Sequence, residues 1–220
     1  MSEEKAVAVK EKEPLFSSKI KRTFSDPISD NNPITIQTLG ICSALAVTTQ
    51  LKPAIAMAVA VTIVCGCSNV IISLIRNYIP NKIRIIVELA VVATAVILVD
   101  QLLRAYAYEL STKLGAFVGL IITNCIIMGR LEAYAIGNKP WPSFVDGIGN
   151  GMGYGIILIV IGAIRELFGS GTLLDLKIIP EGMYALGYAN NGLLLFPPGA
   201  FFILGLIIWF QRSRSGHVEH

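Results

Sequence analysis

Long uncharged stretches, rich in Ala, Val, Ile and Leu, alternate with short charged clusters along most of this 220-residue chain. A helix needs about 20 apolar residues to cross a bilayer, and six stretches of the chain are candidates. They are Pro33–Leu51, Pro53–Ile75, Ile85–Tyr106, Leu114–Gly129, Gly147–Phe168 and a span within Met183–Phe210. The pattern therefore predicts an all-α polytopic membrane protein, with a domain of six transmembrane helices over residues 33–210.

Two of these stretches are poor membrane spans. The fourth has 16 uncharged residues between Lys113 and Arg130, which make a helix of about 24 Å, shorter than the roughly 30 Å hydrocarbon core. The first is long enough, but hydroxyl and amide side chains dilute it. Each poor span contains one isolated cysteine, Cys42 in the first and Cys125 in the fourth. We predict that the first and fourth helices are broken.

The six spans divide into two sets of three, and a poor, cysteine-containing span comes first in each set. Since three is odd, two similarly folded halves must have opposite orientations in the membrane, which is an inverted repeat. A short similarity supports this division, because "SLIRN" (73–77) ends the second span and "GAIRE" (162–166) lies in the fifth. We therefore predict a 3+3 inverted repeat whose broken helices meet near the midplane.

The two ends of the chain are polar. Residues 1–32 mix both charge signs with Ser and Pro, which predicts a cytoplasmic extension, mobile or lying on a partner, or a plain disordered tail. Residues 211–220 are expected to form a C-terminal cytoplasmic tail. With six spans, both termini lie on the side whose segments carry thirteen Lys and Arg residues, against five on the other side. The positive-inside rule assigns that side to the cytoplasm.

Composition agrees with a membrane protein. Hydrophobic residues make up 54% of the chain and charged residues 15%, whereas soluble domains carry about 25% charged residues. The net charge of +3 and the lack of a recognisable motif indicate no nucleic-acid partner. The run "GIGNGMGYG" (147–155) does not match a dinucleotide-binding motif. Its Gly147, Gly151 and Gly155 share one helix face, which favours close packing against a partner helix.

The isolated cysteines point to metal chemistry. Thiolates bind soft metals, and iron–sulfur clusters are usually held by four of them. Cys42 and Cys125 occupy matching places in the two halves, so they can supply two ligands at mid-depth, and a facing protein of the same design would supply two more. Cys65 and Cys67 point about 200° apart on one helix, and we interpret them as inert packing residues.

Four segments carry a resemblance to a known family. They are "DNNPITIQTLGICSALAVTT", "SLIRNYIPNKIRIIVE", "LIITNCIIMGRLEAYA" and "PSFVDGIGNGMGYG". Together they closely resemble the family of D subunits of the sodium-translocating NADH:quinone oxidoreductases, over about residues 30–210. The related ion-translocating Rnf complexes share the two cysteine motifs, whereas "SALAVTT" and "RNYIPNKIRI" are more similar to the sodium pump. The long N-terminal tail and the "CGC" are not part of the family pattern.

The resemblance implies a membrane electron-transfer subunit of a sodium-pumping NADH:quinone reductase in the bacterial inner membrane. Cys42 and Cys125 match the cysteines that hold an iron centre, a 2Fe–2S cluster, together with two cysteines of a homologous partner, the E subunit. Other subunits of such a complex bind NADH and the flavins, and electrons finally reduce a quinone such as ubiquinone. The chain itself is therefore expected to have no complete active site and no catalytic residue.

Acidic residues inside membrane spans are costly, so they are candidates for function. Asp100 and Asp146 are candidate ion-pathway residues, because carboxylates offer sodium hard oxygen ligands. The plainer interpretation pairs Asp100 with Arg104 one turn later and makes Asp146 a helix N-cap. Glu88 is expected to pair with Arg84 in the same way.

Two other functions remain open from the residues. The chain could be the equivalent subunit of an Rnf ferredoxin:NAD oxidoreductase, which its neighbouring subunits would distinguish. It could also be a small secondary transporter that uses the inverted repeat for alternating access. The cysteines argue against a transporter, because a substrate site needs no paired soft ligands. Iron content of the purified assembly separates these functions.

Overall fold

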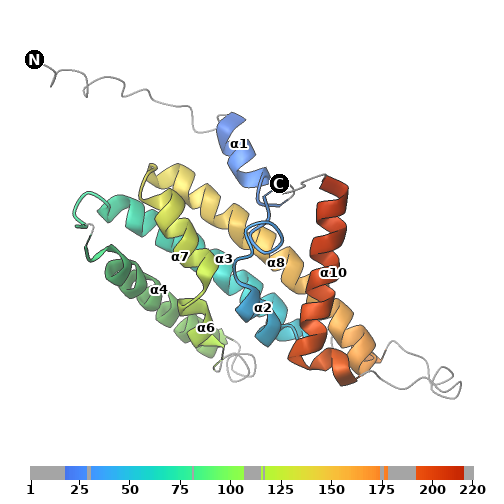
Figure 1. Cartoon of the computed structure of the whole chain (residues 1–220). Helices are drawn as coiled ribbons and strands as arrows, with labels where there is room; N and C mark the ends of the chain where they lie inside the picture. The colour runs from blue at the N-terminus through green and yellow to red at the C-terminus, as the bar shows by residue number, and fades with distance from the viewer. Residues whose placement is uncertain are drawn as a thin grey trace, which may run out of the picture.

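The computed structural model describes residues 18–28, 31–80, 82–106, 115, 117–173, 176–177 and 192–215 (Figure 1). Its α-helices are α1 Ser18–Ser25, α2 Ile41–Val47, α3 Leu51–Ile75, α4 Arg84–Tyr106, α6 Val118–Ile122, α7 Cys125–Arg130, α8 Pro140–Ser170 and α10 Pro197–Ser215. The π-helix η1 Leu131–Ala135 continues α7, and the 3-10 helix η2 Gly192–Leu195 precedes α10. Strands β1 Thr172–Leu173 and β2 Leu176–Lys177 pair antiparallel.

Four helical segments of the described residues are long and apolar enough to cross a membrane. They are Leu51–Ile75, Arg84–Ala105, Val118–Ala135 and Pro140–Ser170. The protein is therefore a helical membrane protein, with its strands confined to one two-residue pairing within the described chain. Six spans and the 3+3 repeat stay predictions.

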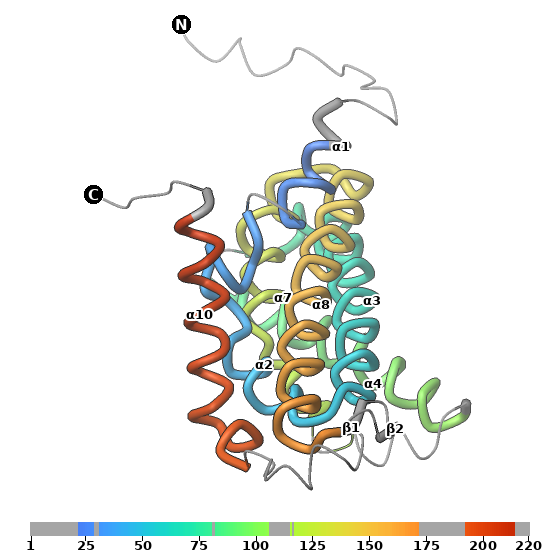
Figure 2. Tube along the Cα trace, turned by 90° about the vertical axis from the view of Figure 1, so that its right-hand side faces the viewer, coloured from blue at the N-terminus to red at the C-terminus, as the bar shows by residue number. Residues whose placement is uncertain are grey.

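The long helices α3 and α8 form the centre of the molecule (Figures 1 and 2). They run antiparallel, and small residues face each other along the contact. The facing pairs are Gly66 with Gly147, Thr62 with Gly151, and Ala58 with Gly155. Small side chains let two membrane helices approach closely. The close-packing role of the glycine face is thus confirmed, and its partner is a helix of the same chain.

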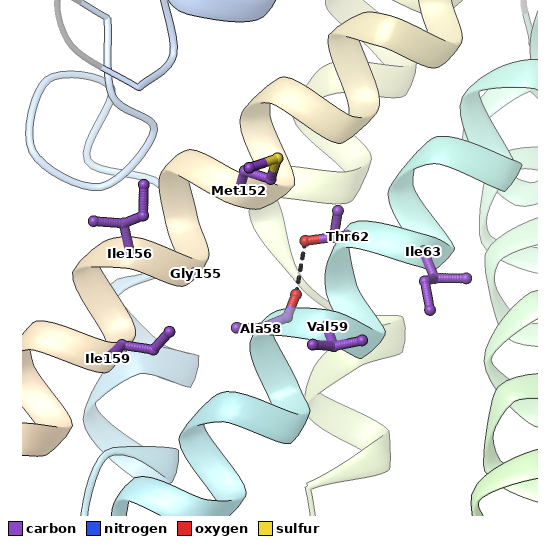
Figure 3. Close-up of a pocket in the computed structure, with 8 residues that line it drawn as sticks. All are labelled: Ala58, Val59, Thr62, Ile63, Met152, Gly155, Ile156 and Ile159. Atoms are coloured by element: carbon purple, nitrogen blue, oxygen red, sulfur yellow. Dashed lines mark hydrogen bonds between the residues drawn. The ribbon is translucent and has the colours of Figure 1, made fainter.

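A shallow apolar groove of about 300 Å³ runs beside this contact (Figure 3). It is lined by Ala58, Val59, Thr62, Ile63, Met152, Gly155, Ile156 and Ile159. The Thr62 hydroxyl donates a 2.7 Å hydrogen bond to the carbonyl oxygen of Ala58, one turn earlier. This polar group is satisfied within its own helix, so the groove presents a surface compatible with hydrocarbon.

Gly151→Ala is expected to destabilise the protein. A Cβ atom at residue 151 would lie 2.6 Å from the Cα atom of Thr62, and a backbone atom cannot rotate away. Overpacking of this kind costs about 1–3 kcal/mol. We expect a lower thermal unfolding midpoint in detergent. Gly205→Ala on α10 is the matched control, because nothing in the described chain lies within 4 Å of its added Cβ atom. Equal midpoints for the two variants would contradict the close α3–α8 contact.

The shorter elements pack around the central pair. Helices α2 and α7 both contact α3, while α10 contacts α2, α8 and η2, and α4 contacts α3, α6 and α7. Helix α1 packs on α8, where the carbonyl oxygen of Phe24 would lie 3.2 Å from a Cβ atom added to Gly149. Helix α1 and the C-terminal end of α10 lie at the same end of the bundle, and the β1–β2 pair lies at the other (Figure 2).

The helix breaks predicted in the first and fourth stretches are confirmed, whereas the ends of other helices differ from the ends of the predicted spans. The first stretch is helical only over Ile41–Val47, and the fourth is interrupted between Ile122 and Cys125, so both cysteine-containing stretches are broken. Helix α8 begins at Pro140 rather than Gly147, because proline suits a first helical turn. Helix α10 continues through residue 211 to Ser215, since nothing in "QRSRS" stops a helix. Helix α8 ends at Gly171, whose φ of 69° is a left-handed conformation that favours glycine.

Candidate functional site

Cys42 and Cys125 each lie in the first turn of a short helix. Cys42 is the second residue of α2 and Cys125 is the first residue of α7. Both side chains are exposed on the surface of this chain, and both cysteines are free thiols. Each thiol is therefore available to a ligand or a second protein that covers this part of the chain.

The residue before each helix explains why the chain breaks there. Gly40 precedes α2 with a φ of 74°, a left-handed conformation that glycine adopts without strain. Asn124 precedes α7 in an extended conformation, and its side chain accepts a 3.1 Å hydrogen bond from the backbone N–H of Ile126. This is an N-cap, which satisfies one of the free N–H groups of the first turn. The sequences "GIC" and "NC" thus start a helix at each cysteine.

A buried hydrogen-bond network connects the two breaks. The hydroxyls of Ser43 and Tyr154 are 2.8 Å apart, and the amide nitrogen of Asn124 donates to Ser43 Oγ at 3.4 Å. All three side chains are fully buried. Because Ser43 follows Cys42 and Asn124 precedes Cys125, the network brings the two cysteine-containing segments side by side.

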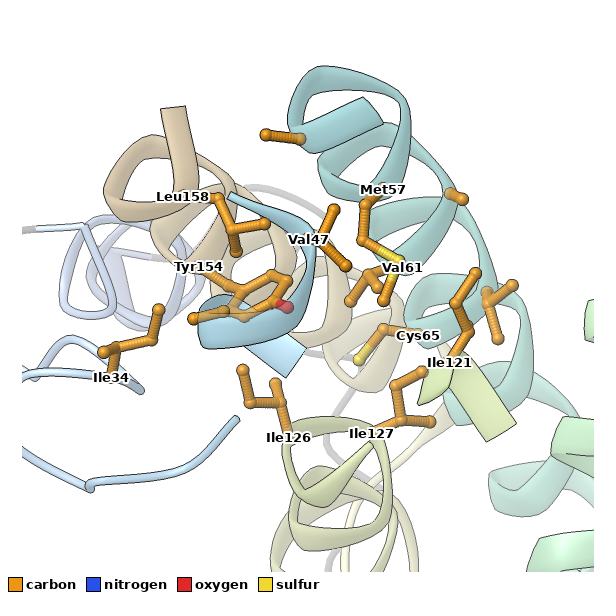
Figure 4. Packing of buried hydrophobic residues seen from close by; sticks show 14 of the residues in the cluster. Ile34, Val47, Met57, Val61, Cys65, Ile121, Ile126, Ile127, Tyr154 and Leu158 are labelled. Carbon is orange, nitrogen blue, oxygen red and sulfur yellow. The ribbon is translucent and has the colours of Figure 1, made fainter. Parts of the chain in front are cut away.

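The network lies in the central apolar core, which Figure 4 shows around Tyr154. Tyr154 is next to the midpoint of the 31-residue helix α8. Gly40 packs directly against this core, since a Cβ atom there would lie 2.7 Å from Ile126 Cδ1 and 3.2 Å from Tyr154 Cε2. The close approach of Gly40, Ile126 and Tyr154 fixes the entry into α2.

Arg165 holds the other end of α2. Its side chain is fully buried, and its guanidinium donates to Thr48 Oγ1 at 2.6 Å and to the carbonyl oxygen of Leu45 at 3.1 Å. The same group donates to the carbonyl oxygens of Leu194 and Leu195, at 3.0 and 2.7 Å. Arg165 therefore ties α2 and η2 to α8 through acceptors at helix C-terminal ends, where a positive charge is favourable.

Glu166, the next residue, fixes the start of α3. Its Oε2 atom accepts a 2.6 Å hydrogen bond from the backbone N–H of Leu51, the first residue of that helix. A carboxylate is favourable at a helix N-terminus because it meets unpaired N–H groups. Arg165 thus holds the end of α2 and Glu166 holds the start of α3, so the two residues together fix the turn between these helices.

Cys42 and Cys125 have side chains of the kind that bind soft metals. Two exposed thiols lie on adjacent segments, and no described residues form a group of three or more His, Cys, Asp and Glu that could hold a metal ion. Cys65 is fully buried in the core, and Cys67 lines an apolar groove between α3 and α4. Cys65 therefore lacks the exposure of Cys42 and Cys125, and Cys67 lies among apolar side chains of α3 and α4.

Asp146 is not the N-cap that the sequence suggested. It lies in the second turn of α8, where both carboxylate oxygens accept hydrogen bonds from Arg130, one of them from Nε at 2.9 Å. Asn150 donates to the carbonyl oxygen of Asp146 at 2.9 Å. An arginine on α7 thus neutralises this acid.

A small polar cavity of about 130 Å³ adjoins the Arg130–Asp146 pair. Its lining includes polar residues from the N-terminal part of the chain: Thr23, Asp26, Asn31 and Gln37. Asn150 also lines it, and its Oδ1 atom is buried with no hydrogen-bond partner among the described residues. No sequence pattern indicated this cavity, because its walls come from distant parts of the chain.

The acids Asp100 and Glu88 differ in whether they form the ion pairs predicted from the sequence. Asp100 pairs with Arg104 at 2.9 Å, as expected, while its Oδ1 atom is buried without a hydrogen-bond partner in the described chain. The expected Glu88–Arg84 pair is wrong, because Arg84 instead pairs with Glu132 of η1. Glu88 is fully buried, and neither of its oxygens has a hydrogen-bond partner within the described residues.

Comparison with known proteins identifies the class. Residues 20–208 match the family described as "Rnf-Nqr subunit, membrane protein", so the chain belongs to the Rnf-Nqr family of membrane proteins. It is 59% identical to the D subunit of the Na(+)-translocating NADH-quinone reductase of Psychromonas ingrahamii over 204 residues, which is 92% of this chain and 97% of that protein. The proteins of the same name from Serratia proteamaculans and Proteus mirabilis are each 57% identical, and the matches cover 90% and 92% of this chain and 94% and 98% of those proteins.

Proposed function

We propose that this chain is the D subunit of a sodium-translocating NADH:quinone reductase and carries electrons through the membrane part of that complex. Its similarity over nearly full length to proteins of that name supports this role and favours it over an Rnf subunit. The observation that carries the proposal is the pair of exposed thiols, Cys42 and Cys125, on two helix breaks that one buried network joins.

The thiols of Cys42 and Cys125 would hold an iron centre together with two cysteines of the homologous E subunit. A 2Fe–2S cluster bound there would accept and release one electron at a time. The chain's own contribution is to hold two ligands in place, because clusters of this kind take four thiolates. A transporter function has no comparable support, since paired soft ligands serve no purpose in alternating access.

The neighbours of the two thiols support a position at mid-depth in the membrane. Tyr154, which contacts the residue after Cys42, lies next to the midpoint of α8. Mid-depth is where an intermediate electron carrier is needed, since the hydrocarbon core is roughly 30 Å thick. A partner subunit that covers both exposed thiols would exclude water from the site and so tune the reduction potential.

Determination of iron and labile sulfide in the purified complex tests the proposal. One such centre beyond that of the NADH-oxidising part is expected, and its loss from a complex that lacks this chain would assign it to the membrane site. A complete complex with no membrane iron would overturn the proposal.

Six spans and a 3+3 inverted repeat belong to the same proposal. The order of elements supports them, since α2, α3 and α4 and then α7, α8 and α10 each give one short helix followed by two long ones. The antiparallel contact of α3 with α8 is what two inverted halves require. Residues 1–32 and 211–220 would then lie in the cytoplasm.

Fusions of alkaline phosphatase and green fluorescent protein are expected to place Gly216 in the cytoplasm and Lys177 on the opposite face of the inner membrane. The Lys and Arg distribution and the positive-inside rule give this orientation. Helix α1 and the end of α10 lie at one end of the bundle, with β2 at the other, which agrees with it (Figure 2). The same reporter result at both sites would rule out the six-span arrangement.

Asp100 and Asp146 remain the proposed ion-pathway residues. The unpaired buried oxygen of Asp100 is an acceptor that a sodium ion could use, whereas both oxygens of Asp146 are engaged by Arg130. Asp100→Asn is expected to raise the sodium concentration that half-saturates quinone reduction, with membrane iron unchanged. An unaltered sodium dependence would leave Asp100 as the partner of Arg104 alone.

A further inference from the structure

Ser43, Asn124 and Tyr154 occupy a special place, because two of them adjoin Cys42 and Cys125 in the chain and the third joins those two. We propose that these three side chains form a positioning bridge that fixes the separation and orientation of the two thiols. The inference rests on the proposed role of both cysteines as iron ligands, and it assigns a function to residues with no ligand role themselves.

The hydrogen-bond arrangement can be assigned atom by atom. Ser43 Oγ donates its one hydrogen to the carbonyl oxygen of Gly40 at 2.9 Å. It must then accept in its other two contacts, from the Tyr154 hydroxyl at 2.8 Å and from Asn124 Nδ2 at 3.4 Å. A hydroxyl has one donor and two acceptor sites, so this arrangement uses all three of them at Ser43.

The bridge is hydrogen-bonded to the main chain near each of the two cysteines. On the Cys42 side it ends at the carbonyl oxygen of Gly40, and on the Cys125 side Asn124 Oδ1 accepts from the N–H of Ile126. These backbone groups are two residues and one residue from the respective cysteines. Movement of either helix start therefore breaks a hydrogen bond in the core.

Burial makes the bridge stiff. Ser43, Asn124 and Tyr154 are each 0% exposed. An unpaired polar group in such surroundings is costly, so the arrangement with all partners present is strongly preferred. Phenylalanine would fill the volume of Tyr154 equally well in an apolar core, and the hydroxyl is therefore needed for its hydrogen bond rather than for packing.

Orientation of metal ligands by neighbouring hydrogen bonds is a general requirement. Loss of such a neighbour typically costs about 10–100-fold in metal affinity or activity. Neither Ser43 nor Tyr154 makes a hydrogen bond to a thiol among the described residues, so both are positioning residues that act through the backbone next to the cysteines. Their effect should appear in how tightly the iron is held and in its electronic environment.

The test uses the complete complex with Tyr154→Phe, Ser43→Ala and the double variant. Iron retention against a chelator, the electron paramagnetic resonance spectrum of the reduced membrane centre and its midpoint potential are measured. Each single variant is expected to lose iron about 10–100-fold more readily, with a changed spectrum and a shifted potential. The double variant should match Ser43→Ala, because that substitution already removes the hydrogen bond that Tyr154→Phe removes. Tyr78→Phe is the control, since Tyr78 is 87% exposed.

Unchanged retention, spectrum and potential in both single variants would overturn the bridge while the ligand role of the cysteines stands. Additive effects in the double variant would overturn it too, because independent sites give additive changes. A wild-type complex without membrane iron, or one that keeps this iron after Cys42→Ala, would instead refute the proposed function and the bridge with it.

Discussion

Replacement of either Cys42 or Cys125 by alanine is expected to remove the membrane iron and abolish NADH-driven quinone reduction. Both thiols are exposed on helix breaks, and a cluster that needs four thiolates cannot lose one without a large drop in affinity. Loss of a residue that only orients a metal ligand typically lowers metal affinity or activity by about 10–100-fold. Loss of a ligand itself should therefore reduce quinone reduction by about 100-fold or more. NADH oxidation with an artificial acceptor at the flavin-containing part should continue.

Cys67→Ala is the matched control for these variants. Cys67 is also an exposed membrane thiol, but it faces the apolar groove between α3 and α4. It should retain both the iron signal and quinone reduction, as should Cys65→Ala. A normal iron signal in the Cys42→Ala, Cys125→Ala double variant would refute the ligand assignment.

Arg165→Met is expected to lower the thermal unfolding midpoint more than any substitution of an exposed arginine. The change removes the donor of the buried Thr48 hydroxyl and of three partly buried carbonyl oxygens. Each buried group left unsatisfied costs about 1–3 kcal/mol, so the loss should be on the order of 3 kcal/mol or more. Arg165→Lys should lower the thermal unfolding midpoint nearly as much, because one ammonium group cannot replace the planar, multiply donating guanidinium.

Two measurements check this expectation. The unfolding midpoint of the complex in detergent should fall clearly for Arg165→Met and stay near wild type for Arg22→Met, whose side chain is 83% exposed. Membrane iron should also be lost more readily, because Arg165 fixes the end of the helix that carries Cys42. Equal midpoints for the two variants would show that the buried guanidinium contributes nothing to stability.

The sequence was sufficient where local signals dominate. The apolar runs of α3 and α4 predicted those helices to within two residues at each end. The glycine stop after α8 and the breaks at the two cysteines were also predictable, because Gly40, Asn124 and Gly171 act on their own backbone.

Other features depend on contacts across the fold and could not be predicted. Asp146 resembled a helix boundary, but Arg130 on another helix neutralises it. In the sequence, Ser43 is one of several polar residues of a poor span. Its hydrogen-bond partner Tyr154 is 111 positions away and is brought close only by the fold. The spacing of Arg84 and Glu88 predicted a pair, yet Glu132 takes the place of Glu88. In each case, a partner distant in the sequence determines the interaction that the side chain makes.

The N-terminal half of the chain obtains some of its hydrogen bonds only late in synthesis, because their partners lie on α8. Ser43 and Thr48 receive hydrogen bonds from α8, and the first N–H of α3 donates to Glu166 of the same helix. A ribosome completes α2, α3 and α4 long before it makes α8. Until α8 is made, the N-terminal half therefore lacks the hydrogen bonds from Tyr154 and Arg165 and the carboxylate of Glu166, which is unfavourable in hydrocarbon. A nascent chain stopped before Pro140 should therefore be a better substrate for membrane proteases than the complete chain.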